Sequence, residues 1–228
     1  MGMKFLKPLW LTLLVLAASI QSAKALEVAR SDMLLHIVEE CTNTQKAGYC
    51  EKCLAPQRQA MCVNHNTCRA TSEIWAQTSE FVAMRDIKMC GCPKQFVHGL
   101  VLPKARVTGI EDPNRTEAIW QFAWDIARQS IDTNEIALAV NPPSRRSQNQ
   151  LHVHLVRLKP GVNARSLNDV TVRTQNLTNV WAVASESALK HQLKEYGLLV
   201  MADPQAGYVL VLTKDSPEAL YTQAHCWP

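Results

Sequence analysis

Glycine, proline and long runs of like charge are all scarce in this sequence. Its 228 residues include only 8 Gly and 11 Pro, and 19% of them are charged. This composition excludes a collagen-like repeat, a disordered chain and a low-complexity linker. The excess of positive charge comes from the N-terminus, because residues 26–228 carry 21 Lys and Arg against 20 Asp and Glu. With no block of like charges, nucleic acid is not the expected partner.

The first 25 residues have the pattern of a secretory signal peptide. Lys4 and Lys7 precede an apolar stretch from Leu9 to Ile20, and Ala23-Lys24-Ala25 has the small residues of a cleavage site. We expect cleavage before Leu26 and a periplasmic or secreted protein. The alternative is an inner-membrane anchor made by an uncleaved N-terminal segment, although the run is shorter than the roughly 20 residues that a bilayer span needs.

Eight cysteines agree with an oxidising compartment, and seven of them lie within residues 41–92. We expect four disulfides, with Cys226 linked back to Cys41. A zinc ribbon is the competing interpretation, because Cys50-Glu51-Lys52-Cys53 has the spacing of zinc ligands. The other cysteines do not supply a second pair with matching spacing, so disulfides are favoured.

The order of helical and strand patterns predicts an α+β fold with an antiparallel sheet. Helices are expected at 31–40, 116–128 and 185–197, where apolar residues recur every three to four positions. Residues 42–80 are expected as loops, and 136–141 and 151–158 as a hairpin. We divide the chain into a signal peptide (1–25), a helix with a Cys-rich disulfide-linked region (26–92) and a main α+β part (93–228), the last two forming one domain. The expected strands are 96–103, 136–141, 151–158, 198–202 and 208–213.

Two histidines in the third expected strand are the strongest functional signal. Side chains alternate along a strand, so His152 and His154 lie on one face together with Gln150. Two imidazoles directed at one site can act as a nucleophile, a base or a proton donor near neutral pH. The same spacing occurs in metal sites that have a third ligand, and in pairs of surface histidines without function. Spacing alone leaves these three interpretations open.

The residues around this strand resemble the histidine-triad (HIT) superfamily and, more closely, the bacterial CDP-diacylglycerol pyrophosphatase family. The resemblance rests on Leu138-Ala139-Val140-Asn141, on Arg146-Ser147-Gln148-Asn149, and on His152 and His154. It covers about residues 34–226, because it extends to Glu39-Glu40-Cys41, residues 103–111, Ala123-Trp124 and His225-Cys226.

The resemblance implies a HIT-like fold and hydrolysis of the phosphoanhydride bond of CDP-diacylglycerol to CMP and phosphatidate. It assigns His152 as a nucleophile that forms a nucleotidyl-histidine intermediate, which is covalent catalysis by a neutral imidazole. His154 and Ser147 become donors to the phosphoryl oxygens, and Asn141 a contact to ribose or phosphate. This mechanism requires no metal and no other cofactor.

One position departs from the family pattern, and others add to the predicted site. Gln150 stands where HIT proteins have the first histidine of the triad, and an amide cannot carry a titratable proton. His98 lies where HIT proteins often have a histidine on a neighbouring strand, so it joins the catalytic candidates. Candidate substrate contacts besides Gln150 are Lys104, Arg106, Arg146 and Asn149.

Two other functions remain open at this point. The first is a metal-dependent hydrolase that uses His98, His152 and His154. The second is a non-catalytic module that binds a nucleotide or lipid and has lost turnover because of Gln150. For a nucleotide-lipid substrate, we also expect the protein to contact the membrane surface.

Overall fold

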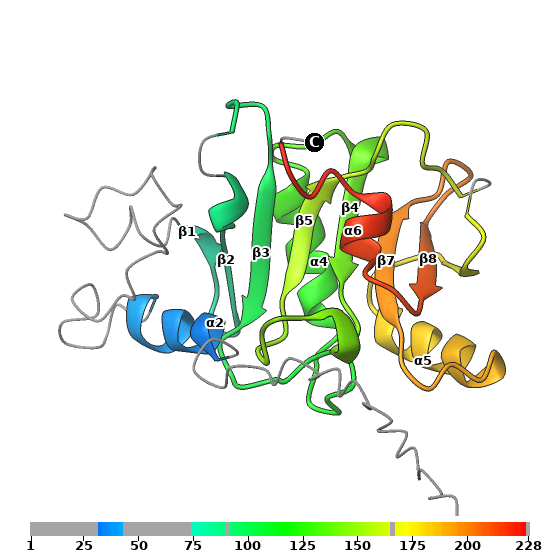
Figure 1. The fold of residues 1–228 in the computed structure, drawn as a ribbon, viewed down its shortest axis with the longest axis horizontal. Helices are drawn as coiled ribbons and strands as arrows, with labels where there is room; N and C mark the ends of the chain where they lie inside the picture. Colours follow the sequence, from blue (N-terminus) through cyan, green and yellow to red (C-terminus); the bar gives the residue numbers. More distant parts are fainter. Residues whose placement is uncertain (1–31, 43–73, 90–91, 165–166, 227–228) are drawn as a thin grey trace, which may run out of the picture.

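An eight-stranded antiparallel sheet organises the computed structural model, which describes residues 32–42, 74–89, 92–164 and 167–226 (Figure 1). The strand order is β1-β2-β3-β5-β4-β7-β8-β6. The predicted α+β class is therefore confirmed. The sheet also crosses the boundary expected after residue 92, since β1 and β2 precede it. The strands are β1 (Ile74–Gln77), β2 (Phe81–Arg85), β3 (His98–Pro103), β4 (Ile136–Val140), β5 (Val153–Arg157), β6 (Val170–Thr174), β7 (Gly197–Ala202) and β8 (Tyr208–Thr213).

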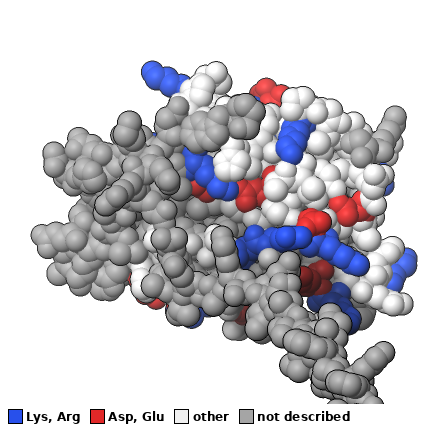
Figure 2. All heavy atoms as spheres, viewed as in Figure 1, with Lys and Arg blue, Asp and Glu red and all other residues white. Residues whose placement is uncertain are grey.

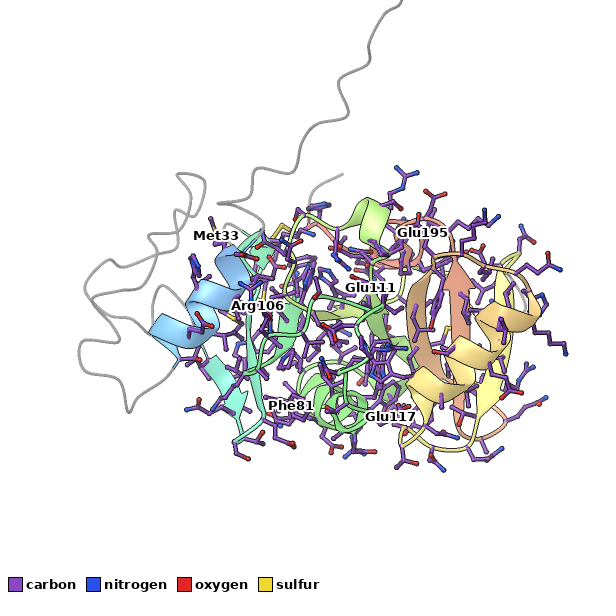
Figure 3. The ribbon with its side chains drawn as sticks, turned by 90° about the horizontal axis from the view of Figure 1, so that it is seen from below. Met33, Phe81, Arg106, Glu111, Glu117 and Glu195 are labelled. Carbon is purple, nitrogen blue, oxygen red and sulfur yellow. A yellow bond between two sulfur atoms is a disulfide. The ribbon has the colours of Figure 1, made fainter. Side chains whose placement is uncertain are left out.

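Helices α4 (Ala118–Ala127) and α5 (Val180–Lys190) cover one face of the sheet, which is the lower face in Figure 3. Their apolar sides form the main core with the strands. Trp120 of α4 and Trp181 of α5 lie with ring centroids 4.5 Å apart, and neither is more than 3% exposed. Burial of such large rings stabilises this layer and holds the sheet in place.

The opposite face carries two smaller apolar clusters with a polar region between them. Helix α2 (Met33–His36), which continues as the π-helix η1 (Ile37–Cys41), packs on β2 and β3 through Leu34, Ile37 and Val38. Helix α6 (Pro217–Tyr221) contacts β4 and β7, and Tyr221 packs against the second cluster. The centres of β3 and β5 lie between these clusters, so side chains on this face of the two strands lie between α2 and α6.

Five of the strands confirm the predicted ones to within two residues at each end, and β4 and β5 pair as the expected hairpin. The prediction of loops across 42–80 is wrong at its end, where β1 forms. β1 is an edge strand with an irregular register and partly exposed side chains, so it lacks the alternation that marks a strand. In the predicted turn between β7 and β8, Gly207 has φ of +81°, which favours glycine.

The helix expected at 185–197 lies earlier in the chain, at Val180–Lys190. The carboxylate of Glu117 accepts hydrogen bonds from the backbone N–H groups of Trp181 and Ala182, each at 2.9 Å, and so caps the start of α5 from another helix. Gln192 has φ of +54°, a conformation that ends a helix. Because the N-terminal cap is a tertiary contact, no local pattern around residue 180 reveals it.

A disulfide joins Cys92 to Cys226, with a Cα–Cα distance of 5.7 Å. The expected link from Cys226 to Cys41 is therefore wrong, because the C-terminal segment runs past the start of β3 and meets Cys92, in the segment between β2 and β3. Cys50, Cys53, Cys62, Cys68 and Cys90 lie outside the described residues, so the set of four disulfides and the zinc ribbon stay predictions.

The expected signal peptide and its alternative as an anchor also lie outside the described residues. Among the residues that the structure describes, no helix has the length and apolar character of a membrane span.

Candidate active site

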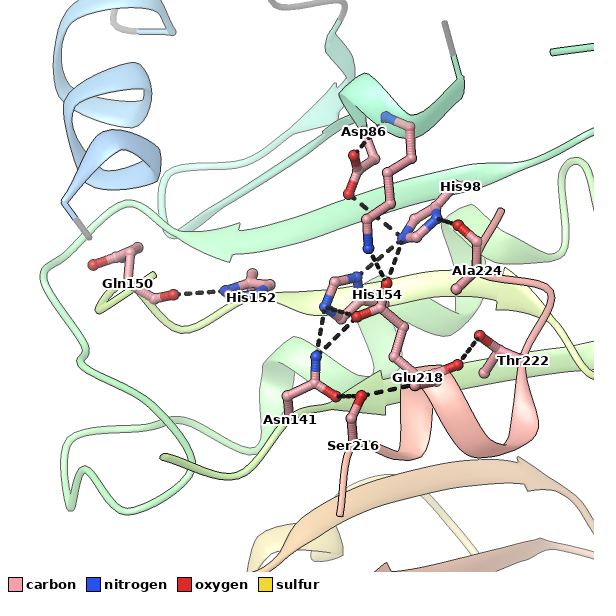
Figure 4. A network of polar contacts seen from close by, with 12 residues as sticks. Asp86, His98, Asn141, Gln150, His152, His154, Ser216, Glu218, Thr222 and Ala224 are labelled. Atoms are coloured by element: carbon pink, nitrogen blue, oxygen red, sulfur yellow. Dashed lines mark hydrogen bonds and ion pairs between the residues drawn. The ribbon is translucent and has the colours of Figure 1, made fainter. Parts of the chain in front are cut away.

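His98, His152 and His154 meet on the face of the sheet that carries α6 (Figure 4). The register pairs Leu100 of β3 with His154 of β5, so His98 and His154 are diagonal neighbours. Their ring centroids are 5.3 Å apart, and those of His152 and His154 are 4.8 Å apart. Val153 and Leu155, which alternate with the two histidines along β5, point into the main core. The alternation of this strand therefore places His152 and His154 side by side on the opposite face.

His152 has one ring nitrogen bound to the backbone and one directed elsewhere. Its Nδ1 lies 2.8 Å from the carbonyl oxygen of Gln150. A carbonyl only accepts, so Nδ1 carries the proton and Nε2 of the neutral ring has a lone pair. Among the described residues, none hydrogen-bonds to Nε2. Burial lowers the pKa of His152 below its ordinary value of 6.5, which favours this neutral form. The arrangement is that of an imidazole nucleophile.

His98 and His154 form a hydrogen-bonded pair. Nδ1 of His98 lies 3.0 Å from the carbonyl oxygen of Ala224, to which it donates. Nε2 of His98 is 3.0 Å from Nδ1 of His154, so a single proton lies between the two rings. When both rings are neutral, His154 is the donor in this contact.

Glu218 of α6 reaches the other side of His154. Its Oε2 is 3.2 Å from Nε2 of His154 and accepts a hydrogen bond of 2.8 Å from Nδ2 of Asn141. The hydroxyl of Ser216 donates to Oδ1 of Asn141 at 2.7 Å, and this contact orients the amide. The same Nδ2 lies 3.5 Å from Nε2 of His154.

Lys88 and Asp86 complete the buried cluster from the segment between β2 and β3. The Lys88 ammonium binds Oε1 of Glu218, and Oδ2 of Asp86 lies 3.5 Å from Nε2 of His98. Burial opposes ionisation of Glu218, but the adjacent His154 imidazole and Lys88 ammonium hold the pKa of its carboxyl well below the usual range. Burial also lowers the pKa of His98 against the attraction of Asp86 and Glu218, and lowers that of His154 well below 6.5 against the attraction of Glu218.

The structure brings Asn141 and the three histidines together but places most other predicted contacts elsewhere. The Gln150 amide donates to the carbonyls of Pro103 and Ala105, each at 2.8 Å, and accepts from Val107 N at 3.3 Å. Ser147 is exposed in the loop before β5, and Lys104 is half-buried just after β3. Three of the remaining side chains bind carboxylates: Arg106 and Asn149 bind Asp32, and Arg146 binds Glu111 through two 2.7 Å contacts.

Sequence reasoning missed Asp86, Lys88, Glu218 and the carbonyl of Ala224. None of them stands in a motif, and Glu218 is 130 residues from Lys88 along the chain. The one local signal is Ser216-Pro217-Glu218, which is a helix start, with the Ser216 hydroxyl accepting from Ala219 N at 3.1 Å. That pattern predicts a helix and not a site.

Asp86, His98 and His154 can in principle hold a metal ion, because each offers a ligand atom within 4.8 Å of the others. The two histidine nitrogens of this group are hydrogen-bonded to each other, and the Lys88 ammonium binds the neighbouring Glu218 carboxylate. His152 is not part of this group, so the structure does not gather the three histidines of the metal alternative around one point.

A groove of about 1250 Å³ runs beside α6 and has Lys88, Glu218 and Ala224 of the cluster in its wall. Phe96 and Leu220 add apolar surface to it. Basic and acidic side chains alternate on this face, as Figure 2 shows. Two of the basic ones lining the groove are paired, Arg145 with Asp215 and Arg157 with Glu135.

Residues 29–192 match the family model described as CDP-diacylglycerol pyrophosphatase. The chain belongs to this family. A CDP-diacylglycerol pyrophosphatase of Yersinia pestis is 27% identical over 192 residues, which cover 68% of this chain and 73% of that protein. A probable CDP-diacylglycerol pyrophosphatase of Mycobacterium leprae (strain TN) is 38% identical over 79 residues, 30% of this chain and 28% of that one. A relative from Mycobacterium bovis (strain BCG / Pasteur 1173P2) is 32% identical over 87 residues, 33% and 32% of the two chains.

Matches to the two mycobacterial members of the CDP-diacylglycerol pyrophosphatase family thus span less than a third of either relative. The family match includes β2, β3, β4 and β5, and with them all three histidines. It ends before α6, so Glu218 and Ala224 lie beyond the matched residues.

Proposed function

We propose that this protein hydrolyses CDP-diacylglycerol to CMP and phosphatidate through a nucleotidyl-histidine intermediate on His152. Family membership supports the reaction and substrate. The observation that carries the mechanism is the hydrogen bond from Nδ1 of His152 to the Gln150 carbonyl, because it leaves the Nε2 lone pair to attack phosphorus.

The reaction has two displacements at the same phosphorus. Nε2 of His152 attacks the phosphorus next to cytidine, and the anhydride P–O bond breaks with its electron pair leaving on phosphatidate. The Gln150 carbonyl then accepts a hydrogen bond from a ring that has become cationic, which stabilises it. Water attacks the same phosphorus, the N–P bond breaks, the ring regains its lone pair, and CMP leaves with the oxygen of water.

His98 and His154 act beside the nucleophile in this proposal. His154 is the ring closest to His152, and its Nε2, which has the lone pair when the ring is neutral, can accept the proton that the attacking water loses. His98 holds the other nitrogen of His154 in place. Asn141 lies next to the same Nε2, where its amide can bind phosphate or ribose.

The other side chains predicted to contact substrate differ in whether they must first break an existing hydrogen bond. Ser147 is exposed and can reach a ligand without breaking a contact that the structure contains, and Lys104 is half-buried just after β3. Arg106, Arg146 and Asn149 would first have to leave their carboxylate partners. Gln150 contributes its carbonyl to His152, while its amide holds the segment after β3.

A HIT-like architecture, export by residues 1–25 to the periplasm or outside the cell, and contact with a membrane surface belong to the same proposal. The substrate is a lipid, so its phosphates lie at a membrane surface. The exposed Leu220 on α6 and the groove beside it offer apolar surface next to the cluster.

The test is CMP release from CDP-diacylglycerol by wild type and His152→Ala, with His191→Ala as a matched control at an exposed position. His152→Ala should keep the circular dichroism spectrum and lose turnover by well over tenfold, because the covalent route is removed. Acid-quenched wild type should carry one cytidylyl group on the peptide containing His152. A His152→Ala variant with more than about a tenth of wild-type turnover would refute the mechanism.

A further inference from the structure

Glu218 is a buried carboxylate in a part of the chain that lies beyond the family match. Its side chain is 8% exposed and touches Asn141, Lys88 and His154, while Ser216 at the start of the same helix holds Asn141. The disulfide between Cys92 and Cys226 ties this C-terminal segment to the residues just before β3.

The fold alone does not explain a charge at this position. A buried ion pair is rarely more stabilising than apolar side chains of the same volume, because both charges lose their hydration. Glu218 also lies between apolar clusters that a hydrophobic residue could join. Its contacts therefore indicate a role in the site.

Only a carboxylate can accept hydrogen bonds from both donors beside Glu218, the Lys88 ammonium and the Asn141 amide. Oε1 accepts from the Lys88 ammonium, and Oε2 accepts from the Asn141 amide. A glutamine of the same shape has one acceptor and one donor. Whichever way it turns, its NH₂ group faces either the ammonium or the amide NH₂.

The orientation in which the glutamine NH₂ group faces the Asn141 amide would change the hydrogen bonds of the histidines. If the Asn141 amide turns over to avoid the new NH₂ group, its oxygen instead of Nδ2 lies beside Nε2 of His154. Nε2 then faces this oxygen and the NH₂ group that replaces Oε2, 3.2 Å away, where wild type has the Asn141 NH₂ group and a carboxylate oxygen. The two groups that decide whether Nε2 or Nδ1 carries the ring proton are therefore both exchanged. His98 cannot compensate in its neutral form, because its own proton is held by the Ala224 carbonyl.

We propose that Glu218, held by Lys88, is a positioning residue of the active centre: through the Asn141 amide and through its own 3.2 Å contact to Nε2, it sets the side of the His154 ring that carries the proton. The sequence of contacts is Lys88, Glu218, Asn141, His154 and His98, ending at the Ala224 carbonyl (Figure 4). The distances between these residues support the positioning role itself. Its effect on turnover rests on the proposed function.

The variant that tests this is Glu218→Gln, with Glu186→Gln as the matched control. Glu186 is exposed on α5, which covers the opposite face of the sheet, and it does not line the groove. We expect Glu218→Gln to lower kcat for CMP release about tenfold or more while KM changes by less than about threefold, because binding groups are kept. Glu186→Gln should match wild type.

A second readout does not depend on activity. In ¹⁵N-histidine-labelled protein without substrate, the ring-nitrogen signals report which nitrogen of His154 is protonated. Glu218→Gln should move the His154 and His98 signals and leave the His152 signals in place. The charged and titratable groups facing His154 are Glu218, His98, His152 and Lys88, with Asp86 against His98, so each signal is followed against pH.

Lys88→Met provides both a check on folding and a test of coupling. Alone it should move the same signals less than Glu218→Gln does, because Oε2 still accepts from Asn141. Combined with Glu218→Gln it removes the ammonium, so the Gln oxygen can face Asn141 and the NH₂ group can face the space left by Lys88. The double variant should therefore be more active than Glu218→Gln alone.

The outcomes separate the two proposals. If wild type releases no CMP but the His154 signals respond to Glu218→Gln, the proposed function fails and the positioning role stands. If wild type is active and Glu218→Gln leaves the ring signals or kcat unchanged, the positioning role is overturned. Should Glu218→Gln not fold, unchanged His154 signals in Lys88→Met would overturn it equally.

Discussion

The carbonyl oxygen of Gln150 lies 2.8 Å from Nδ1 of His152, while the amide of the same residue points to the backbone of residues 103–107. One residue thus orients the proposed nucleophile with its main chain and holds a neighbouring segment with its side chain. The contact to His152 comes from the backbone, so it does not depend on which side chain stands at position 150. A histidine at position 150 would therefore leave this hydrogen bond in place.

Replacing Gln150 should therefore affect stability more than chemistry. Gln150→Ala leaves the buried carbonyl of Pro103, the partly buried carbonyl of Ala105 and the buried N–H of Val107 without their partner, and should lower the free energy of unfolding by about 1–3 kcal/mol. Urea denaturation measures this, with the exposed Gln121→Ala as a control. Turnover per folded molecule in Gln150→Ala and Gln150→His should stay within about tenfold of wild type. A larger loss would mean that the amide itself contacts the substrate.

The Cys92–Cys226 disulfide should matter for both stability and activity. It closes 134 residues, and in the loop-entropy description such a link contributes about 4–5 kcal/mol. Cys92→Ser/Cys226→Ser should lower the denaturation midpoint and reduce turnover, because Ala224 and Glu218 are on the segment that it holds. Peptide mapping without reduction should recover the linked pair. Recovery of Cys226 bound to a different cysteine would contradict this pairing.

Stability should fall as the pH is lowered from 7.5 to 5.5. Burial lowers the pKa of His98, His152 and His154 in the folded state below 6.5, so below that pH the unfolded chain binds protons that the folded chain does not. Their contribution is complete above 6.5 and is lost as the pH drops towards the folded pKa. Denaturant titrations should show a shallower pH dependence for His154→Asn and an unchanged one for the exposed His191→Asn. Equal slopes in all three proteins would refute this origin.

Removing metal ions should leave CMP release intact. The ring nitrogens of His98 and His154 that face each other are hydrogen-bonded, and the Lys88 ammonium supplies positive charge beside the carboxylates. Activity after exhaustive dialysis against a chelator, together with the zinc content of the protein, measures this. Stoichiometric zinc with loss of activity on its removal, restored by adding zinc back, would favour the metal-dependent hydrolase that uses Asp86, His98 and His154.

Local patterns were sufficient for much of the sheet and for the centre of the site. β4, β5, β7 and β8 are short apolar runs between turn residues, and the hairpin of β4 and β5 follows from their order. The pairing of His152 with His154 needs only the two-residue alternation of a strand, which sends Val153 and Leu155 to the opposite face. These features depend on neighbours a few residues apart, and the sequence therefore contains them explicitly.

Tertiary structure alone decided which groups surround the histidines. Lys88 and Glu218 are 130 residues apart, Cys92 and Cys226 are 134 apart, and the cap that Glu117 places on α5 comes from another helix. Each of these contacts exists because burial of the apolar faces brings particular strands and the C-terminal segment next to one another. A charge or a cysteine has the same local pattern whichever partner it meets, so its partner is set by the packing of the whole sheet.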